Sequence, residues 1–598
     1  EQGPEPEEAR LLEYLAGLPE NEPLDPDDQA IALVAAAVGY HRREDKQFWW
    51  SHYDRLNQPV ADWADTRDVF IVERAEADGT WAKPTSRSNP VRPLRLTGRI
   101  AEGSGFAPGS RAFLMYNPPF PQFLAQSHDG RNLRCGKFGT VVAEVGREGD
   151  RDVVVITEKL TRGASEHFET PIALTPDQPV PTKSLRRALS DLAVQVGSTL
   201  PRLPKHPALD LLRRRPPRLA TLASLPPVPD GADGYITAIT AAVAELDHSY
   251  LAVQGPPGTG KTHVGSHVIA ELVSRGWKVG VVGQSHAVVE NMLCSAILKA
   301  GVPADRVAKK LNTNGAGSGA DGGDESRAGS GGVPGGRSGS LPAVPWSRRS
   351  DDDVTALLAS PGGCLIGGTA WTMTGSLVPA GSLDLLVIDE AGQYSLANTL
   401  AVSQAAPRLL LLGDPQQLPQ VTQGKHPEPV DESALGWLSD GFHTLPPERG
   451  YFLATSWRMS PELCRAVSEL SYDGRLRAAP AAIARRLDGA PAGVECVYVD
   501  HAGNSTSSPQ EAAEVVRQVR AHLGLAWLDP GMVPQRSAVD SEAGGARPLD
   551  QEDILVVAAY NAQVQLIRSS LEQAGLTRVR VGTVDKFQGQ EAAVVIVS

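Results

Sequence analysis

The sequence predicts an α/β protein with two parallel-sheet lobes, preceded by a helical linker and a small β-barrel. Near-continuous apolar runs recur from residue 235 onward, as expected for parallel strands that are buried on both faces. Before them, residues 66–175 hold short β-rich runs separated by Gly and Pro, which is typical of a small barrel. The length of 598 residues fits several domains of this size.

Composition divides the chain into five units. We expect residues 1–65 to form a helical linker region and residues 66–175 an accessory barrel. Residues 176–234 are expected to form a helical, proline-rich stalk. The first lobe then covers 235–430, and the second lobe covers 431–598 and is expected to be truncated.

Apolar runs give the strands of the two lobes. The predicted strands of the first lobe are 250–254, 278–283, 364–369, 383–389 and 408–414. Those of the second lobe are 495–500, 553–560, 579–584 and 592–598. Within the first lobe, between the strands 278–283 and 364–369, residues 312–350 are dominated by Gly, Ser and Asp, a composition that cannot bury enough apolar surface to fold. We therefore predict a disordered insertion there.

Composition also excludes several classes of protein. The five cysteines are scattered without a CxxC pair, which argues against a disulfide scaffold or a zinc ribbon and favours the cytoplasm. No apolar run approaches the ~20 residues that span a bilayer, so no membrane association is expected. The net charge of −13 means that any nucleic-acid site must be a local groove.

A phosphate-binding motif follows the first predicted strand of the first lobe. It consists of Gly255, Pro256, Pro257, Gly258, Thr259, Gly260, Lys261 and Thr262. Its glycines allow successive backbone N–H groups to point at phosphate oxygens, and the following helix adds its positive N-terminal end. Lys261 is predicted to reach the β- and γ-phosphates, and the Thr262 hydroxyl to bind Mg²⁺.

Two adjacent carboxylates complete the predicted nucleotide site. Asp389 and Glu390 directly follow a buried run of apolar residues, at the end of a parallel strand where ligands bind. We predict that Asp389 holds Mg²⁺ through water and that Glu390 polarises the attacking water. Positioning and charge neutralisation of this kind are the main requirements of phosphoryl transfer.

Further motifs resemble those of the superfamily 1 helicases, in particular the 1B branch of up-frameshift RNA helicases and nuclease–helicase fusions. The segment 413–421 is similar to motif III, in which the glutamine, here Gln417, senses the γ-phosphate. The segment 454–461 is similar to the motif whose arginine, here Arg458, reaches the γ-phosphate. Trp457 stands where the family has a tyrosine that stacks on adenine.

The remaining motifs also resemble this family, which implies two RecA-like lobes. The segment 581–591 is similar to motif V, which implies that Gly589 and Glu591 face the nucleotide, with Glu591 on the ribose. By the same resemblance, Ser285, Thr369 and Thr583 contact the sugar–phosphate backbone of a nucleic-acid strand.

The resemblance implies an ATP- and Mg²⁺-dependent helicase that travels 5′-to-3′ on a single strand, in DNA repair or processing. DNA is favoured over RNA because residues 1–65 resemble the linker of bacterial proteins that carry a RecB-like nuclease upstream. The alternatives are an RNA helicase, a nucleotide-switched clamp that does not translocate, and a P-loop kinase.

Departures from the family pattern give two further expectations. No glutamine lies between Asp230 and Tyr250, where many relatives have one that recognises adenine, so we do not expect adenine specificity to arise by that route. The chain begins at Glu1 and ends at Ser598, before the family's motif VI, so we expect a piece of a longer protein that binds ATP and hydrolyses it slowly.

Two clusters in the N-terminal half each allow two interpretations. The basic and aromatic run 41–50 either packs its aromatic side chains in a core or stacks on nucleic-acid bases. The arginines between 186 and 218 form either a solvated face or a patch that follows phosphates.

Overall fold

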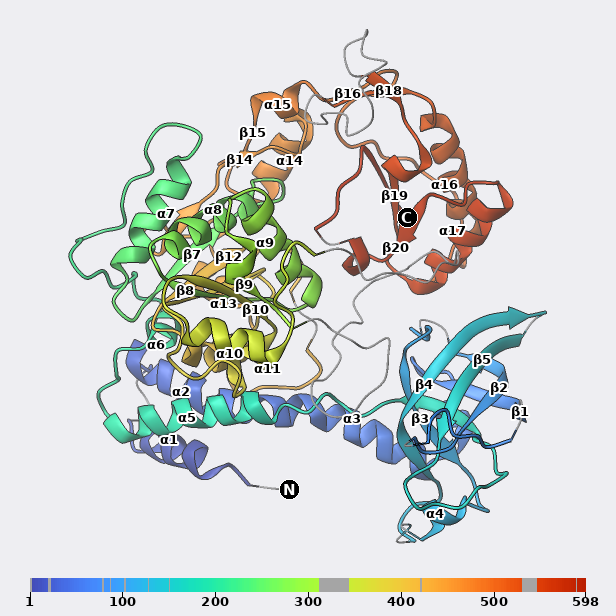
Figure 1. Ribbon diagram of the computed structural model, residues 1–598. Coiled ribbons are helices and arrows are strands. Elements are labelled where there is room, and N and C mark those ends of the chain that lie inside the picture. The colour runs from blue at the N-terminus through green and yellow to red at the C-terminus, as the bar shows by residue number, and fades with distance from the viewer. Residues whose placement is uncertain are drawn as a thin grey trace.

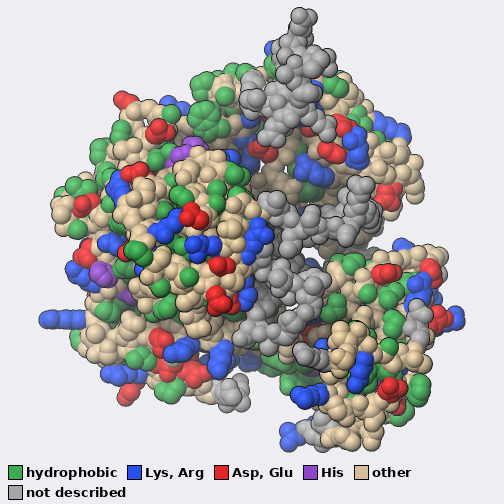
Figure 2. All heavy atoms as spheres, in the orientation of Figure 1, with side chains coloured by type: hydrophobic (Ala, Val, Ile, Leu, Met, Phe, Trp, Pro, Cys, Tyr) green, Lys and Arg blue, Asp and Glu red, His purple; other side chains and the backbone are tan. Residues whose placement is uncertain are grey.

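The computed structural model describes most of the chain. The described residues are 3–19, 23–77, 80–86, 88–101, 104–126, 128, 130–149, 151–310, 344–419, 422–529, 546–587 and 589–598. Figure 1 shows a large first lobe in green and yellow, a second lobe in red and a barrel in cyan. On the face drawn in Figure 2, basic and acidic side chains are interspersed.

The barrel closes from six antiparallel strands in the order β1-β2-β5-β4-β3-β6. These strands are β1 (Phe70–Ala77), β2 (Val91–Ile100), β3 (Arg111–Tyr116), β4 (Cys135–Glu148), β5 (Arg151–Lys159) and β6 (Ala173–Pro176), and α4 (Gln122–Ala125) lies between β3 and β4. Inward-facing residues alternate with outward-facing ones along β2, where Leu94 and Leu96 are fully buried. The predicted barrel is therefore confirmed.

The first lobe is built on a seven-stranded parallel sheet, in the order β13-β7-β12-β11-β8-β10-β9. The strands are β7 (Tyr250–Gln254), β8 (Lys278–Val282), β9 (Val307–Ala308), β10 (Cys364–Gly368), β11 (Leu385–Asp389), β12 (Leu409–Gly413) and β13 (Gly450–Phe452). Because β13 pairs with β7, the first lobe continues to Phe452, past the predicted boundary at 430.

Alternate residues of these strands enter two separate cores, which explains why the runs are apolar throughout. One core covers the sheet with α7 (Gly234–Glu245), α8 (Lys261–Ser274) and α9 (His286–Leu298). The other face is covered by α10 (Asp351–Ala359), α11 (Ala370–Thr374), α12 (Leu396–Val402) and α13 (Ala434–Ser439). The predicted parallel α/β fold is thus confirmed for this lobe.

The predicted linker and stalk share the second of these cores. Their helices are α1 (Pro6–Ala16), α2 (Pro26–Val38), α3 (Tyr40–Asn57), α5 (Lys183–Thr199) and α6 (Pro207–Leu212). The last nine residues of α2 are all buried, and they pack against α1, α5 and α12. Figure 1 shows α1, α2 and α5 lying together under the first lobe.

Helix α3 extends from the first lobe to the barrel. Near its start, Glu44 accepts hydrogen bonds from the backbone N of Gly424 (3.0 Å) and Nε2 of His426 (2.7 Å). Near its end, the ring of His52 packs against Phe113 at 4.7 Å between centroids. In the aromatic run, Trp49 packs against the barrel, whereas Trp50 is exposed, so the core interpretation holds for only part of the run.

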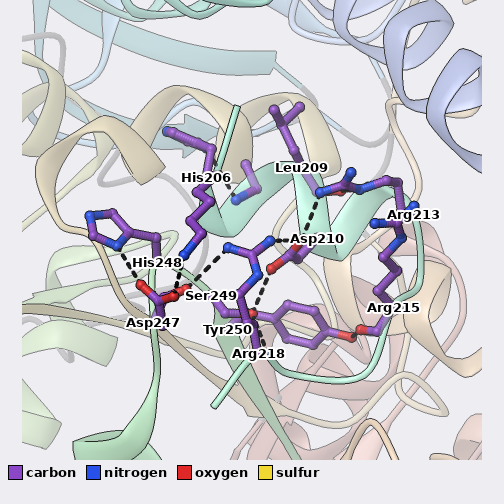
Figure 3. A network of polar contacts seen from close by, with 12 residues as sticks. His206, Leu209, Asp210, Arg213, Arg215, Arg218, Asp247, His248, Ser249 and Tyr250 are labelled. Atoms are coloured by element: carbon purple, nitrogen blue, oxygen red, sulfur yellow. Dashed lines mark hydrogen bonds and ion pairs between the residues drawn. The ribbon is translucent and has the colours of Figure 1, made fainter. Parts of the chain in front are cut away.

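A buried ionic network joins α6 to the start of β7 (Figure 3). The carboxylate of Asp210 accepts hydrogen bonds from Arg213 (2.7 Å), Arg218 (2.6 Å) and the hydroxyl of Ser249 (2.9 Å). Arg213 and Arg215 also pair with Asp27. Arg213 and Arg218 therefore make internal ion pairs, and both predicted interpretations are wrong for them, whereas the side chain of Arg215 is 52% exposed, as the solvated interpretation predicts.

The predicted insertion 312–350 lies mostly outside the described residues. Its last residues, 344–350, are described, and Trp346 is fully buried in the core under α9. Ala308 and Arg348 form a parallel bridge next to β9. The predicted insertion therefore extends too far at its C-terminal end, because Trp346 packs in the core of the first lobe.

A connecting segment, residues 453–485, follows the first lobe. It contains β14 (Thr455–Ser456), α14 (Pro461–Ser471), β15 (Arg477–Ala478) and α15 (Pro480–Ile483). β14 and β15 pair in parallel, and they lie with α14 beside the first lobe in Figure 1.

The second lobe has a parallel sheet of three described strands in the order β20-β19-β21, covered by two helices. Its elements are β16 (Arg486–Leu487), α16 (Pro509–His522), β17 (Ala526–Leu528), β18 (Ala546–Pro548), β19 (Ile554–Val557), α17 (Asn561–Gln573), β20 (Arg580–Gly582) and β21 (Val594–Val597).

One predicted strand of this lobe is wrong. Residues 495–500 form no strand, and the side chain of Tyr498 is 94% exposed. An apolar run becomes a strand only when a neighbouring strand pairs with it, and none of the described strands does so here. Among the described residues, no helix combines the length and the apolar character needed to cross a bilayer.

Candidate active site

The phosphate-binding motif forms the turn between β7 and α8. Gly258 and Gly260 have φ angles of 76° and 82°, a region that glycine enters without strain. Gly260 is the N-cap of α8, so the positive end of this helix opens onto the turn. A Cβ atom on Gly255 would lie 2.3 Å from Cγ of Lys261, so only glycine fits there.

Lys261 is folded over its own turn. Its Nζ donates a hydrogen bond to the backbone O of Gly255 at 2.7 Å. The hydroxyl of Thr259 donates to the backbone O of Pro256 at 2.7 Å, which tightens the turn. Thr262 follows in the first turn of α8 and is partly exposed. The loop thus gathers a cation and a helix N-terminus, which is the donor set that binds phosphate.

Asp389 lies at the carboxyl end of β11, next to β12 and in the same sheet as β7. Its carboxylate is buried, and the backbone N of Glu390 donates to Oδ1 at 3.1 Å. Burial, together with the charge of Glu390, raises the pKa of Asp389 to about 7, although the charge of Lys261 opposes the shift. A buried carboxylate with this little compensation fits a divalent cation, which would bind its charged form.

Glu390 has a φ angle of 56°, in the left-handed region that non-glycine residues seldom enter. Such conformations cost free energy and cluster at functional sites. The backbone N of Gln393 donates to the carbonyl of Glu390 at 2.9 Å, and this turn fixes the backbone of Glu390 beside Asp389.

The motif around Gln417 is hydrogen-bonded to the phosphate-binding turn. The backbone N of Gly255 donates to the carbonyl of Gly413 at 2.8 Å. One residue later, the buried carboxylate of Asp414 accepts a hydrogen bond from Nε2 of Gln417 at 3.3 Å. Gln417 is therefore held near the end of β12, the strand that is hydrogen-bonded to the phosphate-binding turn.

The connecting segment closes over the same turn. The hydroxyl of Ser456 donates to the backbone O of Pro257 at 3.0 Å, and the backbone N of Trp457 donates to the carbonyl of Gly258 at 2.8 Å. A Cβ atom on Gly258 would lie 2.3 Å from Cβ of Arg458. The structure thus brings Arg458 against the phosphate-binding turn, as the predicted role of this arginine requires.

Arg458 also reaches the second lobe. Its Nε donates to the carboxylate of Glu591 in an ion pair. Gly589, two residues earlier, has a φ angle of 74°, which suits glycine. Trp457 is 53% exposed beside the turn, so its ring is accessible to a ligand. Residues from both lobes thus meet at Arg458.

The predicted strand-contacting residues fall into two groups. Ser285 and Thr369 follow the neighbouring parallel strands β8 and β10, so both lie at the sheet edge that carries the phosphate-binding turn. The hydroxyl of Ser285 accepts a hydrogen bond from the backbone N of Val288 and caps α9. Thr583 follows β20 in the second lobe, and none of its described contacts joins it to the other two.

Sequence reasoning assigned no role to Asp414 or Ser456, although both lie in the motifs. Asp414 follows a buried strand in the same way as Asp389, and this signal could have identified it. Ser456 gave no such signal, because its role depends on the fold bringing β14 to the phosphate-binding turn.

Comparisons with known proteins agree with this geometry. Two family models, each described as an AAA domain, match residues 237–434 and 438–598. The DNA replication ATP-dependent helicase/nuclease DNA2 of Gallus gallus is 25% identical over 219 residues, which are 36% of this chain and 19% of that protein.

Two further relatives are similar over the same extent. The DNA-binding protein SMUBP-2 of Rattus norvegicus is 30% identical over 37% of this chain and 22% of that protein. The 3′-5′ exoribonuclease HELZ2 of Mus musculus is 28% identical over 36% of this chain and 7% of that protein. The chain spans about a fifth of the length of the first two relatives.

Proposed function

We propose that the chain is a superfamily 1 helicase, an ATP-driven motor that moves along a single nucleic-acid strand. One observation carries the proposal: Arg458 lies against the phosphate-binding turn and pairs with Glu591 of the second lobe. A nucleotide bound at the turn would therefore be contacted from both lobes. Its binding free energy is then available to change the distance between them.

We assign the steps of hydrolysis to residues of this chain. The backbone of the phosphate-binding turn and Lys261 bind the phosphates of ATP. Thr262 and Asp389 would hold Mg²⁺, which neutralises phosphate charge when bound. Glu390 orients and polarises the attacking water, and Gln417 and Arg458 detect the γ-phosphate.

Movement follows if the two lobes hold the strand alternately. Ser285 and Thr369 at the first-lobe edge and Thr583 on the second lobe would bind sugar and phosphate, which carries no sequence information. Translocation is then independent of sequence and weakened by salt.

We favour DNA as the strand, with 5′-to-3′ travel, a nuclease domain in the complete protein and a cytoplasmic location. The names of DNA2 and SMUBP-2 support DNA, and the five free cysteines suit a reducing compartment. The name of HELZ2 supports RNA as the second candidate.

The deciding experiment measures ATP hydrolysis with single-stranded DNA, with single-stranded RNA and without either. Stimulation by DNA, abolished in Lys261→Ala, supports the proposal, and Lys299→Ala on the exposed end of α9 is the matched control. Stimulation by RNA alone would identify an RNA helicase. Strand binding that depends on ATP but proceeds without turnover would indicate a clamp, and phosphate transfer to a small acceptor would indicate a kinase.

A further inference from the structure

Asp414 is the meeting point of three parts of the active site. It directly follows β12 and is 1% exposed. Its Oδ1 accepts hydrogen bonds from Nε2 of Gln254, the last residue before the phosphate-binding turn (3.5 Å), and from the backbone N of Gln416 (3.2 Å). Its Oδ2 accepts from Nε2 of Gln417 (3.3 Å) and from the hydroxyl of Tyr472 (2.6 Å).

Tyr472 brings the connecting segment into this network. It is the C-cap of α14, and its ring is buried with Phe452, Met459 and Cys464. Burial raises the pKa of Tyr472, and the charge of Asp414 raises it further, so the hydroxyl stays protonated and donates a hydrogen bond to Asp414. A phenol that donates to a buried carboxylate forms one of the stronger kinds of hydrogen bond.

Helix α14 connects Tyr472 to Arg458. The helix starts at Pro461, three residues after Arg458, and ends at Ser471, immediately before Tyr472. Its first turn is capped by the hydroxyl of Ser460, which accepts a hydrogen bond from the backbone N of Leu463, and only Met459 lies between Arg458 and this cap. A shift of this rigid helix would therefore move both Arg458 and the Tyr472 hydroxyl.

The same carboxylate oxygen serves Tyr472 and Gln417. Because both donate to Oδ2, the tyrosine hydroxyl limits how closely the glutamine amide can approach. Without the hydroxyl, Oδ2 of Asp414 would keep only the amide of Gln417 as a side-chain donor. Because an unsatisfied buried acceptor is costly, the amide would then move closer to this oxygen. The orientation of Gln417 thus depends on a residue 55 positions later in the chain.

We infer that Tyr472 is a positioning residue whose hydroxyl holds Asp414, and through it Gln417, in register with α14 and Arg458. The inference deepens the proposed function, on which it rests for the roles of Gln417 and Arg458. Contact with the γ-phosphate at Arg458 is communicated through α14 and Asp414 to Gln417.

The test is a double-mutant cycle of wild type, Tyr472→Phe, Gln417→Ala and the double variant. Tyr472→Phe is expected to lower the kcat for ATP hydrolysis at least about fivefold while KM stays within about threefold. The double variant should hydrolyse ATP no more slowly than Gln417→Ala alone, because the tyrosine acts through the glutamine.

Tyr250→Phe is the matched control. Tyr250 is a fully buried tyrosine at the far end of β7, and its hydroxyl donates to the backbone O of Arg215 at 2.7 Å. The control should lose a similar amount of thermal stability and keep the wild-type kcat. Equal kcat values for Tyr472→Phe and the control, or additive effects in the cycle, would overturn the inference.

The cycle also separates the inference from the proposed function. If neither DNA nor RNA stimulates ATP hydrolysis by the wild type, the proposed motor function is contradicted. The double-mutant cycle can still be measured on the basal rate of ATP hydrolysis. If wild type hydrolyses no ATP, the four dissociation constants for the non-hydrolysable analogue AMP-PNP form the cycle, and additivity there overturns the inference.

Discussion

Arg458 forms an ion pair with Glu591, although 133 residues separate them in the sequence and they belong to different parts of the site. Both side chains are partly exposed, and exposed pairs contribute only ~0–1 kcal/mol to stability. The pair is therefore weak enough for a nucleotide that needs both residues to replace it.

Glu591→Ala should remove discrimination at the ribose. If the Glu591 carboxylate accepts a hydrogen bond from the sugar, wild type should bind ATP about tenfold more tightly than 2′,3′-dideoxy-ATP. The variant should bind both with similar affinity in equilibrium titrations. Glu511→Ala, on α16 of the same lobe, is the control. Equal affinities in wild type would show that Glu591 does not contact the ribose.

Glu390→Gln should keep ATP binding and lower kcat by at least ~10²-fold, because the amide cannot act as a general base. Steady-state hydrolysis and equilibrium binding measure the two effects separately. Glu271→Gln, on the exposed face of α8, should change neither value. A Glu390→Gln variant with wild-type turnover would assign the base to another residue.

Trp457→Ala should weaken ATP binding about fivefold or more, if its exposed ring stacks on the base with the ~1–3 kcal/mol typical of such contacts. The loss should be similar for GTP, since stacking depends little on base identity. Trp50→Ala, another exposed tryptophan far along α3, is the control. Unchanged nucleotide affinity would limit Trp457 to its backbone contact with Gly258.

Asp210→Ala should destabilise the protein by ~3–5 kcal/mol, because it leaves Arg213 buried without its main carboxylate partner. Thermal or urea unfolding measures this loss. Asp191→Ala, which removes an exposed pair with Arg187 on α5, should cost less than about 1 kcal/mol. Equal effects of the two substitutions would mean that the buried network contributes no more than a surface pair.

Stability should fall as the pH is lowered from 6.5 toward 4. Burial lowers the pKa of His41 to about 4, assisted by the charge of Arg186, so the unfolded chain takes up a proton in this range that the folded chain refuses. His52 has a pKa lowered to about 4 by burial as well. The midpoint of thermal unfolding, measured from pH 7 to 4.5, should fall less steeply in His41→Phe than in wild type. An unchanged slope would exclude His41 as a source.

Local patterns in the sequence were sufficient to predict the phosphate-binding turn, the five central strands of the first lobe and the barrel. A strand that is buried on both faces must be apolar throughout, and the phosphate-binding turn needs glycine at fixed positions. Both features can therefore be recognised in a short stretch of sequence. The run 495–500 has the same apolar character without a strand to pair with, and pairing is not a local property.

The parts of the site that were missed depend on contacts between distant segments. Tyr472 and Ser456 carry no motif signal, and their roles arise because α14 and β14 pack beside the phosphate-binding turn. The arginines that follow α6 were interpreted as surface charge because their carboxylate partners, Asp27 and Asp210, are identified only by the fold.

The core that α2, α5 and α6 share with the first lobe limits how this protein can be shortened. A chain starting at residue 235 would retain every nucleotide-binding motif but would leave uncovered the apolar face of the first lobe against which α2, α5 and α6 pack. Such a face is an aggregation hazard. Expression of an isolated ATPase core should therefore begin before α1, and its yield of monomeric protein should drop sharply when the start is moved past α2.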